Sequence, residues 1–353
     1  MKITQLQPGW TAVAALLAAV AAGSSVLFAA GADPGDVLAA VVRGAFGDLY
    51  AVGETLTRAT PLLLAGLAVA LGFRAGVLNI GAEGQIMAGA AAAVAVGLHM
   101  GGVPAPIAAA ATLAAAACGG AAAASVAAWL RYRRSVPEVL STILLNFVLL
   151  NLSSWLVRGP LQEAARAYPQ SDRIAAEAML PQLAPPTRLH AGFLLALAAA
   201  GCCYLLLFRT ALGLRLRAVG LGVQAARFAG FEPAKVAFFA TSMSGALAGT
   251  AGGVEVAGLT GRLYGDLSGG IGYVAIAVAL LGRLHPLGIV AAAIVFGALE
   301  SSAAEMQRSA GVSAAVAQVI EATALMGLLA ADFAAKRASR SGATAESAAE
   351  EPA

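Results

Sequence analysis

The stretch TPLLLAGLAVALGFRAGVLNIGAEGQIMAGA, from Thr60 to Ala90, decides the fold of this chain. It begins and ends as an apolar run, but residues 76–85 hold three glycines and three polar side chains. Glycine permits unusual backbone angles and close approach of other groups. The pattern predicts either a break within a helical layer or an ordinary turn that starts a new helix, and the sequence leaves both open. The polar side chains are Asn79, Glu83 and Gln85.

The composition around this stretch is that of a membrane protein. Of the 353 residues, 59% are hydrophobic and 12% are charged, and the mean hydropathy is +0.81. Soluble domains carry about 25% charged residues. Apolar runs tile the chain, so we expect a single transmembrane domain over residues 1–332. Residues 333–353 are rich in Ser, Ala and Glu with a few basic residues, and we expect a disordered cytoplasmic tail there.

The apolar runs predict an all-α, polytopic membrane protein with about ten transmembrane helices. In lipid, only helices and closed barrels satisfy their backbone groups, and runs this long and alanine-rich favour helices. The first run is about as long as a spanning helix needs to be, so we interpret it as a transmembrane helix and not as a cleaved signal peptide. The predicted spans are residues 11–31, 56–73, 84–100, 104–130, 138–157, 190–208, 235–257, 267–282, 286–305 and 312–332.

Basic residues predict the orientation of these spans. They cluster after the fourth, sixth, eighth and tenth spans, and cytoplasmic loops are the ones enriched in Lys and Arg. All four clusters lie on one side only if both termini are cytoplasmic, as an even number of spans also requires. The clusters are Arg131, Arg133 and Arg134; Arg209, Arg215, Arg217, Arg227 and Lys235; Arg283; and Lys336 and Arg337.

The fifth predicted span carries a polar stripe. Its residues are spaced by four, four and seven positions, which places them on one helical face. A polar face on a spanning helix points to the bundle interior, where it lines a translocation path or joins helices; the sequence does not decide between these. Broken helices such as the one predicted at 76–85 often line the binding sites of transporters. The stripe consists of Glu138, Thr142, Asn146 and Ser153.

The inner segment RTALGLRLRAVGLGVQAARFAGFEPAK, residues 209–235, is long, basic and punctuated by glycine. Residues 224–229 are compatible with a short helix, and Gly230 is a plausible stop for it. Such a helix, parallel to the membrane, would suit a partner surface. A basic anchor without a partner is the other interpretation.

Sequence signatures of catalysis are missing. The three lysines do not lie in the G-x-x-x-x-G-K-[ST] loop that binds nucleotide phosphates. There is no Gly-x-Ser-x-Gly or His-Glu-x-x-His motif, and the three cysteines lie in apolar runs without metal-binding spacing. We therefore expect no catalytic residue, no metal site, no cofactor and no nucleic-acid partner. The cysteines are Cys118, Cys202 and Cys203.

Three ordered blocks carry a family resemblance over roughly residues 50–332. The chain resembles the permease subunits of ABC importers for nucleosides and simple sugars, in the branched-chain amino acid/ribose permease superfamily. The Asn-Ile-Gly-Ala-Glu-Gly-Gln core of the opening stretch is specific to the nucleoside and simple-sugar branch. The other blocks are PEVLSTILLNFV at 137–148 and GYVAIAVALLGRLHPLGIVAAAIVFGALE at 272–300.

The resemblance implies an import subunit of the bacterial inner (plasma) membrane whose ATP is bound by a separate subunit. It implies a cytoplasmic ATPase, a second permease that is identical or related, and an extracytoplasmic solute-binding protein as partners within the lipid membrane. It also implies that the inner segment couples to the ATPase. Relatives often carry Glu-Ala-Ala with a glycine four positions after the second alanine, whereas this chain has glutamine first. The implied coupling residues are Arg215, Arg217, Gln224, Ala225, Ala226, Arg227 and Gly230.

The same resemblance points to the translocation path. Its candidates are the polar residues of the break and two residues of the fifth-span stripe, which either hydrogen-bond sugar hydroxyls or hold the broken backbone. The candidates are Asn79, Glu83, Gln85, Thr142 and Asn146.

An ion-coupled secondary transporter of a small polar solute is the alternative hypothesis. Glu83, Glu255 and Glu321 would then be candidates for a proton relay. The identity of the solute stays open, between purine or pyrimidine nucleosides, ribose-like sugars and nucleobase compounds.

Overall fold

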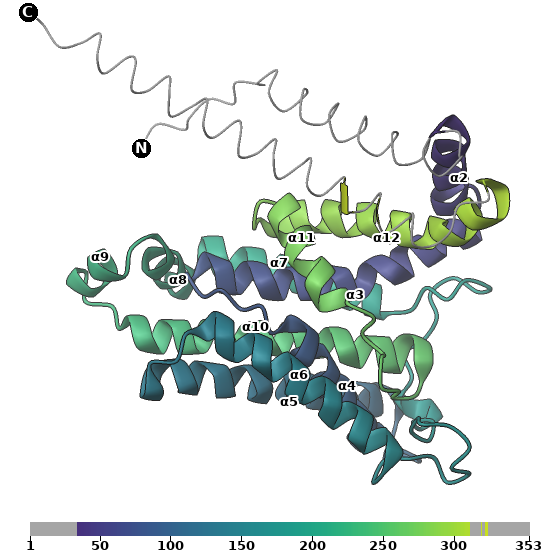
Figure 1. Cartoon of the computed structure of the whole chain (residues 1–353), viewed down its shortest axis with the longest axis horizontal. Coiled ribbons are helices and arrows are strands. Elements are labelled where there is room, and N and C mark those ends of the chain that lie inside the picture. Colours follow the sequence, from purple (N-terminus) through teal and green to yellow (C-terminus); the bar gives the residue numbers. More distant parts are fainter. Residues whose placement is uncertain (1–33, 311–318, 320–321, 324–353) are drawn as a thin grey trace, which may run out of the picture. The chain divides into compact units, whose positions relative to one another are not determined.

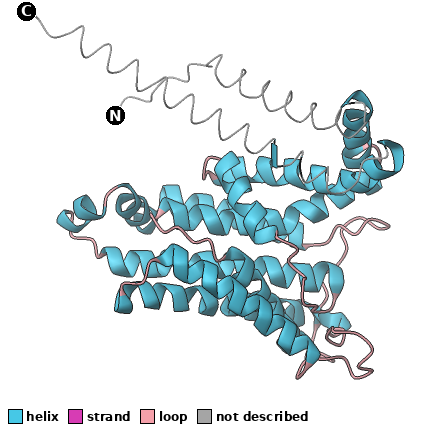
Figure 2. Cartoon of the chain, in the orientation of Figure 1, coloured by secondary structure: helices cyan, strands magenta, loops and turns pink. Residues whose placement is uncertain are grey.

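The computed structural model describes residues 34–310, 319 and 322–323. Within these residues the chain is helical, with loops and no strand (Figure 2). The all-α prediction is thus confirmed for the described part. The predicted first span 11–31, the tenth span 312–332 (apart from residues 319, 322 and 323) with Glu321, and the tail 333–353 lie outside the described residues.

Many of the helices coincide with the predicted apolar runs. The chain divides into two compact units. Of the described residues, 34–47 and those after 298 belong to one unit, and residues 48–298 form the other, which holds all the candidate path and coupling residues. Figure 1 labels the helices. They are α2 (Pro34–Phe46), α3 (Leu49–Arg74), α4 (Ala82–Gly97), α5 (Ala105–Arg134), α6 (Glu138–Arg158), α7 (Gly192–Arg209), α8 (Ala211–Leu221), α9 (Val223–Phe228), α10 (Pro233–Glu255), α11 (Ile271–Leu281) and α12 (Pro286–Ala310).

Five described helices are long and apolar enough to cross a membrane. They are Leu49–Arg74, Ala105–Arg134, Glu138–Arg158, Gly192–Arg209 and Pro286–Arg308, and each overlaps a predicted span. Helices α4 and α11 also fall on predicted spans, but at 16 and 11 residues they are shorter than the roughly 20 residues that spanning requires. Helix α10 has 23 residues, with many Gly, Ser and Thr residues, and is not one of the five.

Helices α4, α5 and α10 pack against one another through glycine and alanine. A Cβ atom added at Gly120 of α5 would lie 2.1 Å from the carbonyl oxygen of Gly245 in α10. At Gly89 of α4, the added atom would lie 2.4 Å from the Cα of Gly249. The backbones therefore touch, as small residues allow in membrane helix bundles. These contacts fix the position of α4, whose first turn directly follows the segment at residues 75–81.

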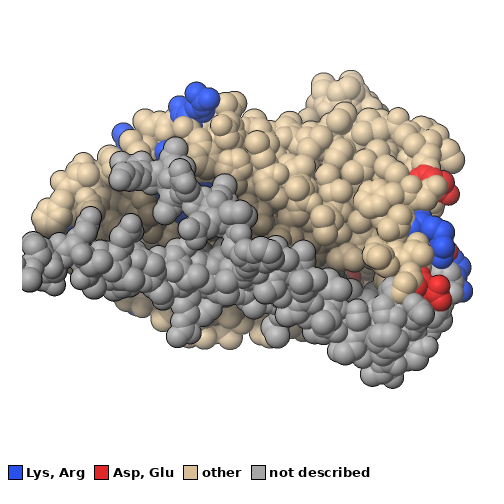
Figure 3. Space-filling view, turned by 90° about the horizontal axis from the view of Figure 1, so that it is seen from above, with Lys and Arg blue, Asp and Glu red and all other residues tan. Residues whose placement is uncertain are grey.

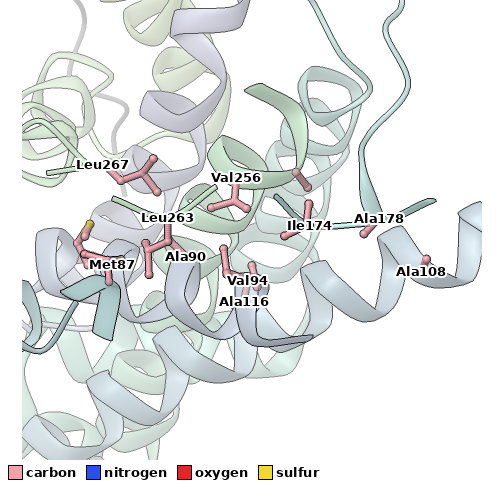
Figure 4. Packing of buried hydrophobic residues seen from close by; sticks show 13 residues of the cluster. Met87, Ala90, Val94, Ala108, Ala116, Ile174, Ala178, Val256, Leu263 and Leu267 are labelled. Carbon is pink, nitrogen blue, oxygen red and sulfur yellow. The ribbon is translucent and has the colours of Figure 1, made fainter. Parts of the chain in front are cut away.

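The long segment between α6 and α7 folds back on the helix ends. Ile174 of this segment joins a buried cluster with Met87, Val94 and Leu263 (Figure 4). The Glu163 carboxylate accepts a hydrogen bond from the Gln170 amide at 2.7 Å. This bond, with further donors from the Tyr168 backbone and Arg262, holds the pKa of Glu163 below its ordinary value. The loop is therefore tied down by both apolar and polar contacts.

His190, at the end of the same segment, is buried just before α7. Its Nδ1 accepts a hydrogen bond from the Gly192 N–H at 3.1 Å. Its ring lies so close to Gly258 that an added Cβ would be 2.3 Å from the imidazole Cε1. Burial lowers the pKa of His190 to about 4, because a charged imidazolium would lose its hydration there.

Candidate functional site

Residues 76–85, predicted as either a break or an ordinary turn, begin with a non-helical segment, which both interpretations require and which is called the break below. Helix α3 ends at Arg74 and α4 begins at Ala82, so residues 75–81 are not helical. Gly76 has φ +75°, in the left-handed region that glycine enters without strain. The backbone returns through a hydrogen bond from the Val77 N–H to the Gly72 carbonyl at 2.9 Å. The chain therefore folds back on the end of α3 before α4 begins.

Asn79 lies at the centre of this segment with all its amide atoms bonded. Its Nδ2 donates to Gln85 Oε1 and to Ser244 Oγ, each at 2.9 Å. Its Oδ1 accepts from Gln85 Nε2 and from the Gly81 N–H, also at 2.9 Å each. Asn79 and Gln85 therefore form a reciprocal amide pair that joins the break to the first turn of α4. Both side chains are buried.

Ser244 of α10 extends the pair to a third helix. Its hydroxyl accepts from Asn79 and donates to the carbonyl oxygen of Ala68 in α3 at 2.7 Å. The sequence analysis missed Ser244, which is one of several hydroxyl residues on α10. Only its contact with residues far away in sequence distinguishes it.

Asn146 of α6 bonds to backbone groups just before and just after the start of α4. Its Oδ1 accepts from the Gly84 N–H and its Nδ2 donates to the Ile80 carbonyl, both at 2.9 Å. Thr142, one turn earlier, is buried but donates its hydroxyl to the Glu138 carbonyl in its own helix. Glu138 accepts from the Leu78 N–H at 3.1 Å. Two residues of the polar stripe, Glu138 and Asn146, therefore bond to the break and to the start of α4.

Glu83 bonds to residues at the start of α11. Its carboxylate is 3% exposed and accepts from the Ser268 hydroxyl at 2.6 Å. It also accepts from the N–H groups of Gly270 at 3.0 Å and Gly272 at 2.7 Å. A carboxylate is stabilised at a helix N-terminus, where unpaired N–H groups and the helix dipole favour negative charge. Glu83 therefore caps a helix that begins almost 190 residues later in the chain.

The structure thus brings the five candidate path residues to one place and adds Ser244 and Ser268. The glycine pair 269–270, which precedes the apolar run of α11, was a sequence signal for a special helix start. In the part of the chain that the structure describes, no group of His, Cys, Asp or Glu side chains is placed to hold a metal ion.

The inner segment forms two short helices, α8 and α9. Thr210 caps α8 by accepting from the Gly213 N–H at 3.0 Å. Helix α9 covers Val223–Phe228, close to the predicted helix at 224–229, and Gly230 follows with φ +80°. Both the predicted helix and its glycine stop are confirmed.

Most of the candidate coupling residues lie on the surface of this segment. Arg215, Gln224, Ala225, Arg227 and Gly230 are exposed, whereas Ala226 is buried and Arg217 is partly buried. Two large apolar side chains are also exposed there, Leu221 at 91% and Phe228 at 93%. In the face shown in Figure 3, the end that carries α8 and α9 in Figure 1 shows blue Lys and Arg side chains.

Comparison with known proteins places the chain in a family. Residues 51–329 match the family model described as the permease component of the branched-chain amino acid transport system. The glucose ABC transporter permease protein TsgB13 of Haloferax volcanii is 36% identical over 92% of this chain and 89% of its own length. The guanosine ABC transporter permease protein NupP of Bacillus subtilis is 34% identical over 88% and 90%. No solved structure matches the chain.

The family match covers most of the chain, the helical structure and both segments discussed above. It supports the permease interpretation over the ion-coupled alternative. The chain belongs to the family of branched-chain amino acid transport system permease components, and it is a multi-pass inner-membrane permease subunit of an ABC transporter whose ATPase is a separate subunit.

Proposed function

We propose that this chain forms the translocation path for a nucleoside or a simple sugar in a binding-protein-dependent importer. The observation that carries the proposal is the segment between α3 and α4, which places buried polar side chains between two apolar helices of a membrane permease. The proteins to which the chain is similar are named for glucose, guanosine and nucleosides, so the solute class is taken from those names. Interrupted helices are a common way to place polar groups at membrane depth.

We assign the residues of the break a holding role and not direct contact with the solute. Asn79 has no amide atom left without a protein partner, and the Glu83 carboxylate already accepts three hydrogen bonds. A solute hydroxyl would have to displace one of these bonds. The network therefore fixes the shape of the backbone beside the path.

For the arrangement in the membrane, we propose ten spans, both termini in the cytoplasm, one transmembrane domain over residues 1–332 and a disordered tail over 333–353. The basic end with α8 and α9 supports a cytoplasmic position for that end, because Lys and Arg favour this side. Helices α4 and α11, although short, are apolar and would lie at membrane depth among longer helices.

We assign ATPase docking to the α8–α9 segment. Leu221 and Phe228 are exposed beside arginines, and apolar anchors with neighbouring positive charge are typical of interaction surfaces. A second permease, identical or related, and an extracytoplasmic binding protein complete the proposed importer.

The test is purification of the tagged chain in mild detergent with its bound subunits, followed by reconstitution in liposomes. We expect an ATPase subunit to copurify, and uptake of guanosine or glucose to require ATP and the binding protein. Uptake by the chain alone, driven by a proton or sodium gradient, would refute the importer and support a secondary transporter.

A further inference from the structure

We infer that the backbone contact between Gly220 of α8 and the Arg74–Gly76 turn carries movement of the inner segment to the buried break. Gly220 is then a positioning residue that sets how much solute moves for each ATP hydrolysed. This inference rests on the proposed function, and it adds Gly220 and the Arg74–Gly76 turn to the residues already assigned to coupling.

The contact is made by main-chain atoms on both sides. A Cβ added at Gly220 would lie 2.2 Å from the Arg74 carbonyl oxygen and 3.0 Å from the Gly76 nitrogen. A Cβ added at Gly76 would lie 3.1 Å from the Gly220 Cα. There is no side chain between the two segments to absorb a displacement. Gly76 and Gly220 are both exposed, but their backbones are already in contact. Movement of α8 toward this turn would therefore move residues 74–76.

Two arginines join the same elements on a single aromatic ring. The guanidinium carbon of Arg217, from α8, lies 5.3 Å from the centre of the Phe208 ring, which belongs to α7. The guanidinium carbon of Arg74, the last residue of α3, lies 5.4 Å from the same ring centre. Both distances are within the range of cation–π attraction. Helix α8 is thereby attached to α3 through side chains as well as through the backbone contact.

Arg74 also holds the turn between α11 and α12. Its Nε donates to the Leu284 carbonyl at 3.0 Å. His285 of the same turn stacks on Phe208 with ring centres 5.2 Å apart. Helix α11, whose start Glu83 caps, is thus held beyond its C-terminal end by Arg74 and Phe208. Phe208 also contacts Arg217 of α8.

The turn at 74–76 leads directly into the polar network. Gly72 is packed so closely that an added Cβ would meet the Val77 carbonyl at 3.2 Å and the Asn79 Cβ at 3.6 Å. Asn79 follows three residues after Gly76 and bonds Gln85 and Ser244. A shift of residues 74–76 therefore changes the geometry of bonds that fix α4 against α10. This continuous chain of contacts runs from the proposed docking segment to the proposed path.

The experiment uses the complete importer in liposomes and measures uptake and ATP hydrolysis in the same vesicles. Gly220→Ala adds one methyl group at the contact. We expect it to lower the ratio of solute taken up to ATP hydrolysed by about threefold or more, within the range seen for residues that carry coupling between sites. Gly201→Ala in α7, where an added Cβ meets no atom within 4 Å, should leave the ratio unchanged.

A second variant and a second measurement distinguish a loss of coupling from a loss of folded protein. Phe208→Leu removes the shared ring without adding a clash, and it should lower the same ratio. Hydrogen exchange of residues 75–81, measured with and without ATP and vanadate, should show a nucleotide-dependent change in the wild type that Gly220→Ala reduces. This readout needs no solute.

The outcomes distinguish the two proposals. Uptake and hydrolysis that fall in proportion in both variants would mean fewer folded complexes and would overturn the inference, as would an unchanged ratio. A wild-type preparation without ATP-dependent uptake or hydrolysis would instead overturn the proposed function.

Discussion

Removal of the Glu83 carboxylate tests whether the break is held by its own hydrogen bonds. In Glu83→Ala, the Gly272 N–H loses its acceptor in a buried position and the Gly270 N–H loses its acceptor in a partly buried one. Each unpaired buried group costs about 1–3 kcal/mol, and together they cost about 2–6 kcal/mol. In Glu83→Gln, one oxygen can still accept, but the amide NH2 then faces a donor, so we expect a smaller loss of about 1–3 kcal/mol.

The assay combines thermal unfolding in detergent with uptake kinetics in liposomes. For a chain of this size, about 2 °C of Tm corresponds to 1 kcal/mol, so Glu83→Ala should lower Tm by about 4–12 °C. Since the carboxylate holds the protein and not the solute, Glu83→Gln should reduce maximal uptake with the KM changed less than about twofold. Glu232→Gln is the control, because its exposed ion pair with Lys235 is worth little.

A rise in KM of tenfold or more, with an unchanged Tm, would refute this reasoning. Such a result would mean that Glu83 binds the solute and that its hydrogen bonds to α11 form only when no solute is bound.

Three further predictions concern other parts of the chain. Gly120→Ala places a methyl group 2.1 Å from the Gly245 carbonyl oxygen and should lower the unfolding temperature strongly, whereas Gly101→Ala, which meets no atom within 4 Å, should not; equal Tm values would contradict the backbone contact. His190 has a folded pKa of about 4 against an ordinary value of 6.5, so the unfolded chain binds the extra proton between these values. The contribution of neutral His190 to the free energy of unfolding is therefore fully present above about pH 6.5 and decreases as the pH falls toward 4. The difference in Tm between wild type and His190→Gln should narrow over that range. A constant difference would contradict the lowered pKa. Gly230→Pro cannot adopt φ +80° and should abolish ATP-driven uptake while the chain remains inserted; normal uptake with the ATPase bound would remove the docking role from this segment.

Periodicity and apolar runs predicted most of the helices correctly. They located α3, α5, α6, α7 and α12 because long apolar segments leave few choices in lipid. The polar stripe of α6 was predicted on one face because four-residue spacing fixes direction on a helix.

The partners of the polar residues could not be predicted in the same way. Glu83 bonds to groups that lie 185 to 189 positions further along the chain, and Ser244 differs little in sequence from its neighbours on α10. Such pairings depend on how the helices are arranged in three dimensions. A local pattern does not contain this information.

The cap that Glu83 provides for α11 also sets an order of assembly. During synthesis, α4 enters the membrane long before α11 exists, and its buried carboxylate has no partner until residues 268–272 arrive. Helix α11, with 11 residues, has its first N–H groups unpaired until it meets that carboxylate. Neither end is stable in hydrocarbon alone. Packing of the start of α11 against Glu83 therefore satisfies the carboxylate and the helix start together, and it can occur only after residues 268–272 have been synthesised.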